Sequence, residues 1–115
     1  LDTHDGLCRR LARGAGMAVA AVDYRLSPET PHPGAVEDAC EAAEWLLRER
    51  AIAPSRLAFA GDSAGAYIAL SAALRISARI ACLVLAYPIL DPSCSTDTAR
   101  RYGEDYILAR EAMRW

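Results

Sequence analysis

Residues 56–65 of the chain read RLAFAGDSAG, a short apolar run that leads into two glycines around one serine. A largely apolar stretch follows at residues 64–76, so the pattern predicts a buried strand, a sharp bend and then a helix. A serine hydroxyl is a weak nucleophile, and a tight strand–turn–helix bend projects it clear of the backbone in a strained conformation. Ser63 is therefore the candidate nucleophile, and Gly61 and Gly65 are expected to give the clearance that the bend requires.

The helix predicted after Ser63 begins at the same bend, so its positive end points at the candidate site. The backbone N–H of Ala64 is then a candidate donor to the oxyanion of a tetrahedral intermediate. Asp62 is adjacent to Ser63 and cannot also orient a histidine on the far side of the hydroxyl, so we expect a structural role for it. Because a GxSxG pentapeptide occurs by chance in many chains, the alternative is a glycine-rich turn in which the serine caps the helix.

Apolar periodicity predicts further helices on both sides of this bend. Residues 35–50 are the clearest case, because they carry an apolar stripe, with acidic residues early and arginines late, as the helix dipole favours. Residues 3–15 show a shorter amphipathic pattern that ends at Gly14 or Gly16. A last helix is predicted from about Ala109 onward.

Short apolar runs predict three strands, over residues 17–22, 56–60 and 80–87. The segment 23–34 contains three prolines within six residues, so an irregular loop is expected there. Strands separated by helices imply crossover connections and a parallel sheet. Three strands make an incomplete sheet with apolar, unpaired edges, so we expect the chain to be a section of a larger α/β domain.

Length and composition exclude several classes of protein. The chain has 115 residues, enough for one small domain and too few for two, and 53% hydrophobic with 24% charged residues argues against disorder. The net charge of −2 gives no electrostatic reason to expect nucleic acid as a partner. No signal peptide is recognised, and no apolar run approaches the ~20 residues of a membrane helix, so we expect a cytoplasmic protein without a membrane span.

The cysteines do not suggest a metal site. The chain has four of them, without a CxxC pair, and only two histidines could join them around a metal: Cys8, Cys40, Cys82 and Cys94. Neither a metal nor another cofactor is therefore expected. Cys40 and Cys82 lie in apolar stretches, where a free thiol behaves as a small hydrophobic group, so we expect both to be buried.

Two motifs, DYRLSPE at residues 23–29 and GDSAG at residues 61–65, resemble the hormone-sensitive-lipase-like branch of the α/β-hydrolases. The Tyr-Pro pair at residues 87–88 and both ends of the chain are similar to the same family, so the resemblance spans nearly all residues. It implies part of an α/β-hydrolase fold and a serine carboxylesterase or lipase. It also implies Ser63 as nucleophile, Ala64 as one oxyanion donor, and short- to medium-chain carboxylic esters as substrates, cleaved through an acyl-enzyme.

This chain departs from the family's pattern in its histidines. The family's His-Gly-Gly-Gly oxyanion loop has no counterpart here, and the triad on this fold runs in the order serine, acid, histidine. His4 and His32 both precede Ser63, and His32 is interpreted as a loop residue that packs or faces solvent. The resemblance places Asp91 in the substrate-covering region and not at the triad acid.

Residues 1–115 are therefore interpreted as the central segment of a single, incomplete α/β-hydrolase domain. In the complete protein we expect an HGG motif shortly before Leu1, and an Asp followed by a His beyond Trp115. Without its base Ser63 should lose most of its rate, so the chain alone is expected to be nearly inactive.

Two other interpretations stay open at this point. A non-catalytic α/β module could bind a partner through the exposed edges of its sheet, which the missing histidine would favour. A related acyl transfer, such as amide or peptide cleavage, is not separated from ester cleavage by these residues. We favour the segment of a carboxylesterase, whose partner would be a small-molecule ester substrate, over the binding module, because a binding module has no reason to keep a strained serine. A homo-oligomer of the full-length protein is left open.

Overall fold

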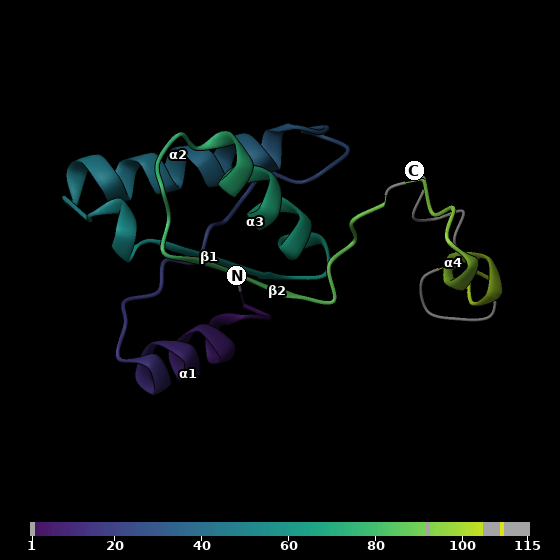
Figure 1. Ribbon diagram of the computed structural model, residues 1–115, viewed down its shortest axis with the longest axis horizontal. Helices are drawn as coiled ribbons and strands as arrows, with labels where there is room; N and C mark the ends of the chain where they lie inside the picture. The colour runs from purple at the N-terminus through teal and green to yellow at the C-terminus, as the bar shows by residue number, and fades with distance from the viewer. Residues whose placement is uncertain (1, 92, 105–108, 110–115) are drawn as a thin grey trace.

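The computed structural model describes residues 2–91, 93–104 and 109 (Figure 1). Helices and strands alternate along most of this length. The elements in chain order are α1 (Asp5–Ala15), α2 (Gly34–Glu49), the 3₁₀ helix η1 (Pro54–Arg56), β1 (Ala58–Asp62), α3 (Ala64–Arg75), β2 (Cys82–Ala86) and α4 (Asp97–Arg101). The described ranges contain no helix with both the length and the apolar character to cross a membrane.

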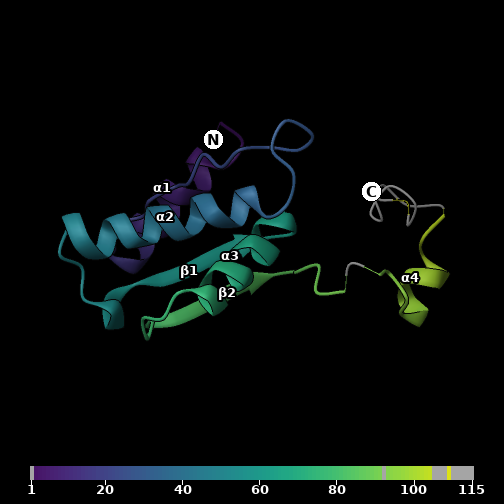
Figure 2. The ribbon, with the colours of Figure 1, turned by 90° about the horizontal axis from the view of Figure 1, so that it is seen from above.

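The strands β1 and β2 form a parallel pair that α3 connects as a crossover helix (Figures 1 and 2). Their register pairs Ala58 with Cys82 and ends with Asp62 opposite Ala86. The helices α2 and α3 pack against each other on one face of the pair, and Figure 1 shows α1 on the opposite side. The predicted parallel α/β arrangement is therefore confirmed.

The core lies between α2, α3 and β1. Val36 and Ala39 of α2 and Ala72 of α3 form a buried cluster, against which Phe59 of β1 packs. Further buried alanines on the same two helices are Ala43, Ala66 and Ala69. Because an alanine side chain is a single methyl group, the two helices can approach closely, and their interface fills without large side chains.

The two faces of β2 differ in burial. Its side chains alternate between exposed and half-buried from Cys82 to Ala86. Leu83 and Leu85 are the half-buried pair on the face toward the helices, whereas Val84 on the other face is 57% exposed. Cys82 alternates onto the same face as Val84 and is exposed. The expectation of a buried thiol is therefore wrong for Cys82, while Cys40 of α2 is half-buried.

Residues 17–22 do not form a strand in the described part of the chain, so that prediction is wrong. A strand needs a neighbouring strand to exchange hydrogen bonds with, and within the described residues β1 pairs with β2 alone. The N–H of Met17 instead donates to the carbonyl of Ala12 at 3.2 Å, just after α1. Met17 and Val19 are 50% and 43% exposed, so the run is apolar without being buried.

Three predicted helices are confirmed within two residues at each end, over residues 3–15, 35–50 and 64–76. Gly16 ends α1 in the left-handed conformation, with a φ of 63°, which glycine adopts without strain. The short α4 is an addition to the prediction, and Thr96 caps it by accepting the N–H of Ala99 at 3.2 Å. The helix predicted from about Ala109 falls on residues 110–115, which lie outside the described part.

Two predicted strands are confirmed with shifted ends. The strand predicted over residues 56–60 begins two residues later, because Pro54–Arg56 form a single 3₁₀ turn. The strand predicted over residues 80–87 is the shorter β2. It ends before Tyr87, whose φ of 36° lies outside the extended region of the backbone.

Replacing Ala72 with leucine should destabilise the full-length protein by about 1–3 kcal/mol, because the closed interface with Val36 and Ala39 has no room for a longer side chain. Urea unfolding followed by circular dichroism measures this change. Glu41→Ala, at an exposed position of α2, is the control and should stay within about 0.5 kcal/mol of wild type. Wild-type stability of Ala72→Leu would contradict a closed α2–α3 interface.

Candidate active site

Ser63 forms a one-residue bend between β1 and α3. Its φ of 51° and ψ of −120° lie in a region that residues with a side chain rarely adopt. The side chain is half-buried and makes no capping hydrogen bond to α3. Helix capping by the serine, the alternative that the sequence left open, therefore does not explain the bend.

Backbone hydrogen bonds hold this bend on both sides. The N–H of Ser63 donates to the carbonyl of Ala86, the last residue of β2, at 3.0 Å. The carbonyl of Ser63 accepts from Ala66 at 3.1 Å and from Tyr67 at 3.3 Å, which starts the first turn of α3. A strained backbone persists only where the surrounding structure determines it. Here the sheet and the helix both do so.

A close approach between β1 and α3 explains Gly61. A Cβ at this position would overlap the carbonyl group of Gly65 and would lie 2.7 Å from the backbone nitrogen of Ala66. At Gly65, by contrast, a Cβ would meet nothing within 4 Å. The clearance expected of both glycines is therefore needed at Gly61 only, and Gly65 contributes its backbone to the contact.

The first N–H groups of α3 lie at the same bend. Ala64 and Gly65 begin the helix, so their N–H groups have no acceptor within it. Ala64 is exposed and adjoins a pocket of about 220 Å³, whose walls include Leu26 of the preceding loop and Val36 of α2. An anionic group placed beside Ser63 would therefore meet the positive end of a helix dipole.

One ion pair fastens the loop before α2 to that helix. Arg25 donates to the carboxylate of Asp38 from its backbone N–H at 2.8 Å, from Nε at 3.0 Å and from Nη2 at 2.6 Å. The hydrogen bonds from the guanidinium, followed by the one from the backbone, lower the pKa of Asp38. Because Arg25 also lines the pocket beside Ala64, the pair fixes one wall of that pocket.

The carboxylate of Asp62 joins three distant segments of the chain. Tyr87 Oη donates to Asp62 Oδ2 at 2.8 Å, and His4 Nε2 lies 3.2 Å from Oδ1. The hydrogen bond from Tyr87, with a smaller contribution from His4, lowers the pKa of Asp62. Sequence spacing gives no signal for this cluster, because the two partners lie 25 and 58 residues away. The contacts supply partners for the structural role expected of Asp62.

Neither histidine contacts Ser63 in the described part of the chain. His4 uses one ring nitrogen toward Asp62, and its Nδ1 lies 2.8 Å from Thr3 Oγ1. His32 is exposed, with its ring centroid 6.1 Å from that of Tyr67. The interpretation of His32 as a loop residue is consistent with this position.

The carboxylate of Asp91 is hydrogen-bonded by residues of its own loop. It accepts hydrogen bonds from the hydroxyl and backbone N–H groups of Ser93 and Ser95. The hydroxyl and backbone donors of Ser93, followed by those of Ser95, lower the pKa of Asp91 to about 2. These contacts occupy the carboxylate locally, and none of them leads to Ser63.

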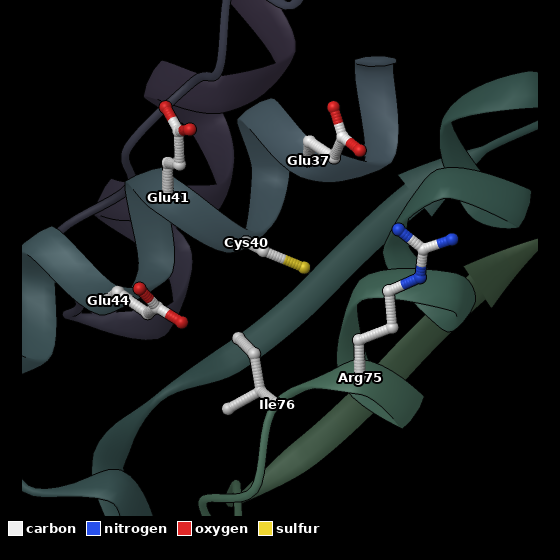
Figure 3. Close-up of a pocket in the computed structure, with 6 residues that line it drawn as sticks. All are labelled: Glu37, Cys40, Glu41, Glu44, Arg75 and Ile76. Carbon is white, nitrogen blue, oxygen red and sulfur yellow. The ribbon is translucent and has the colours of Figure 1, made fainter. Parts of the chain in front are cut away.

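A second pocket, of about 290 Å³, lies at the opposite end of α3 from Ser63. Figure 3 shows Cys40 between the two helices, with Arg75 and Ile76 on one side and three acidic residues of α2 on the other: Glu37, Glu41 and Glu44. Burial raises the pKa of the Cys40 thiol. The pocket is larger than the one beside Ala64, yet it contains none of the groups at the bend, so it is separate from the candidate site.

The chain is similar to known enzymes over all or part of its length. A family described by the α/β hydrolase fold matches residues 1–115. Ethyl acetate hydrolase from Pseudomonas putida is 38% identical over 123 residues, covering 100% of this chain and 39% of that protein. Esterase LipI from Mycobacterium tuberculosis is 53% identical over 72 residues, covering 60% of this chain and 22% of that protein.

A solved structure is similar over nearly the same length. EstE1, a thermophilic and thermostable carboxylesterase cloned from a metagenomic library, superposes with a TM-score of 0.88 at 37% sequence identity. The match covers 99% of this chain and 42% of EstE1. The chain thus spans about two fifths of the length of the ethyl acetate hydrolase and of EstE1.

Gly61→Ala should destabilise the full-length protein by about 1–3 kcal/mol, because the added methyl group would overlap the carbonyl of Gly65 and the backbone would have to move. Gly65→Ala is the matched control: it adds the same methyl group in open space, at a helical position, so stability should be equal or higher. Urea unfolding compares the two variants. Equal losses in both would contradict the close approach at Gly61.

The lowered pKa of Asp38 predicts a pH-dependent contribution to stability. This contribution is complete above the unfolded carboxyl pKa of about 3.9 and is lost as the pH falls through the lower folded value. The difference in Tm between wild type and Asp38→Asn should therefore be largest near about pH 6 and should shrink below about pH 4. Thermal unfolding at stepped pH measures it, and a difference that stays constant over this range would contradict the ion pair with Arg25.

Proposed function

Because this chain belongs to the α/β-hydrolase fold family, we propose that its full-length protein is a serine hydrolase that cleaves carboxylic esters through an acyl-enzyme on Ser63. The observation that carries the proposal is the bend at Ser63, with its φ of 51° and ψ of −120°, between the end of β1 and the start of α3. A serine held in this way and not used for capping has its hydroxyl available to a substrate. The names of the related hydrolases support an ester as the bond that is cleaved.

In the proposed reaction, Ser63 Oγ attacks the carbonyl carbon of the ester and passes its proton to a general base. Negative charge develops on the carbonyl oxygen, and the backbone N–H of Ala64 stabilises it at the positive end of α3. Collapse of the tetrahedral intermediate expels the alcohol, which takes the proton from the base, and leaves the acyl group on Ser63. Water activated by the same base then releases the carboxylic acid.

We assign the general base to a histidine outside residues 1–115. His4 and His32 have other contacts in the described structure, and on this fold the triad histidine follows the serine in the chain. The chain spans 39% of the length of ethyl acetate hydrolase. The triad acid and an HGG-type oxyanion loop are likewise proposed for other parts of the protein. Residues 1–115 are then the central segment of one domain and nearly inactive alone.

The proposed substrates are esters with short- to medium-chain acyl groups. The name of ethyl acetate hydrolase gives that relative an acetyl ester as substrate. Lipase activity and a cytoplasmic location stay predictions, and a homo-oligomeric state of the full-length protein stays open.

A non-catalytic module that binds a partner through a sheet edge is the alternative. Its support is that β1 pairs on one side only within the described residues. The strain at Ser63 argues against it, because a binding surface made of sheet edges has no use for a residue held in that conformation.

Ser63→Ala in the full-length protein should lower kcat on p-nitrophenyl acetate by on the order of a million-fold, because the nucleophile is lost. It should also abolish labelling by a fluorophosphonate probe. Ser55→Ala, an exposed serine in η1 at the other end of β1, is the matched control and should keep both activities. If Ser63→Ala retained hydrolysis and labelling, Ser63 would not be the nucleophile.

A further inference from the structure

Two strained residues lie side by side at the end of the sheet. Asp62 and Ala86 are the last residues paired between β1 and β2. The next residue on each strand has a positive φ, 51° at Ser63 and 36° at Tyr87. Residues with side chains keep such conformations only where their contacts determine them. The contacts of Tyr87 are therefore part of what defines the bend.

A side-chain hydrogen bond connects these two turns. Tyr87 Oη donates to Asp62 Oδ2 at 2.8 Å, and Asp62 directly precedes Ser63. Tyr87 is 71% exposed, so burial of its ring does not explain its backbone conformation. The backbone bond from Ser63 N–H to Ala86 O, at 3.0 Å, joins the same two turns. One backbone and one side-chain hydrogen bond thus tie the candidate nucleophile to the end of β2.

His4 also contacts the carboxylate of Asp62, but this contact is longer than the hydrogen bond from Tyr87. Its Nε2 lies 3.2 Å from Asp62 Oδ1, and the two side chains are 50% and 33% exposed. Whether the His4 nitrogen donates in this contact depends on the tautomer of the ring, whereas the Tyr87 hydroxyl can only donate to a carboxylate. The bond from Tyr87 is therefore the shorter contact and the one with a defined donor.

We propose that Tyr87 is a positioning residue for Ser63 and acts through the carboxylate of Asp62. This role rests on the function proposed above for Ser63. A fixed Asp62 side chain fixes the peptide from which Ser63 turns, and with it the direction of the attacking hydroxyl. The contacts described for Tyr87 do not include Ser63 Oγ or the N–H of Ala64, so it acts on geometry and not on substrate binding.

Tyr87→Phe in the full-length protein removes only the hydroxyl and is the direct test. We expect kcat on p-nitrophenyl acetate to fall about tenfold with KM within about twofold, since orientation of the nucleophile changes while the substrate contacts do not. The rate of fluorophosphonate labelling should fall by a similar factor. Tyr102→Phe, at the end of α4 and apart from the bend, is the matched control and should keep the wild-type rates.

Substitutions of Asp62 test the route of this effect. Asp62→Asn keeps a carbonyl oxygen that can accept from Tyr87, so its kcat should stay within about threefold of wild type. Asp62→Ala removes the acceptor and should lose about as much as Tyr87→Phe. The double variant Tyr87→Phe/Asp62→Ala should be no slower than Asp62→Ala. Once Asp62→Ala has removed the bond between Tyr87 and Asp62, the loss of the Tyr87 hydroxyl breaks no further bond between them.

The outcomes separate this role from the proposed function. A wild-type kcat in Tyr87→Phe, with Ser63→Ala inactive, overturns the positioning role alone. An active Ser63→Ala variant overturns the proposed function itself. If Tyr87→Phe fails to fold, the two variants of Asp62 decide. A greater loss of kcat in Asp62→Ala than in Asp62→Asn supports the positioning role, and equal losses of kcat overturn it.

Discussion

The reversal of the backbone at Ser63 is the constraint on which the rest of this structure depends. A single residue separates the end of β1 from the start of α3, so strand and helix must meet at very short distance. Gly61 permits this contact, because the carbonyl of Gly65 occupies the space where a Cβ would lie. The hydrogen bond from Ser63 to Ala86 then ties the bend to β2. The site therefore forms only together with the parallel pair.

The helix layer fixes the direction in which the bend points. Small side chains such as Ala39 and Ala72 let α2 and α3 pack closely, which sets the position of the first turn of α3 over β1. The ion pair between Arg25 and Asp38 holds the preceding loop against α2, and that loop lines the pocket beside Ala64. Core packing, loop attachment and the helix dipole thus converge on one place, the N-terminus of α3.

The comparison of sequence and structure separates local from non-local causes. The helices α1, α2 and α3 and the bend follow from patterns within a few residues, so their prediction agrees with the structure to within two residues at each end. The predictions of a strand over residues 17–22 and of a buried thiol at Cys82 are wrong for the same reason. An apolar run indicates a preference for burial, but other segments must supply the neighbouring strand and the side chains that cover it. The contact of Tyr87 with Asp62 is missed in the same way, since no periodicity relates residues 25 apart.

The sequence by itself determined the α/β alternation, the candidate serine and the two candidate glycines around it, because each depends on chain geometry over short distances. Only the tertiary structure decided that Gly61 carries the steric requirement and Gly65 does not. It also decided that Asp62 is held by Tyr87 and approached by His4, and that neither histidine meets Ser63 in the described residues. The physical reason is that hydrogen bonds and close contacts between remote segments exist only after the strands have paired and the helices have packed.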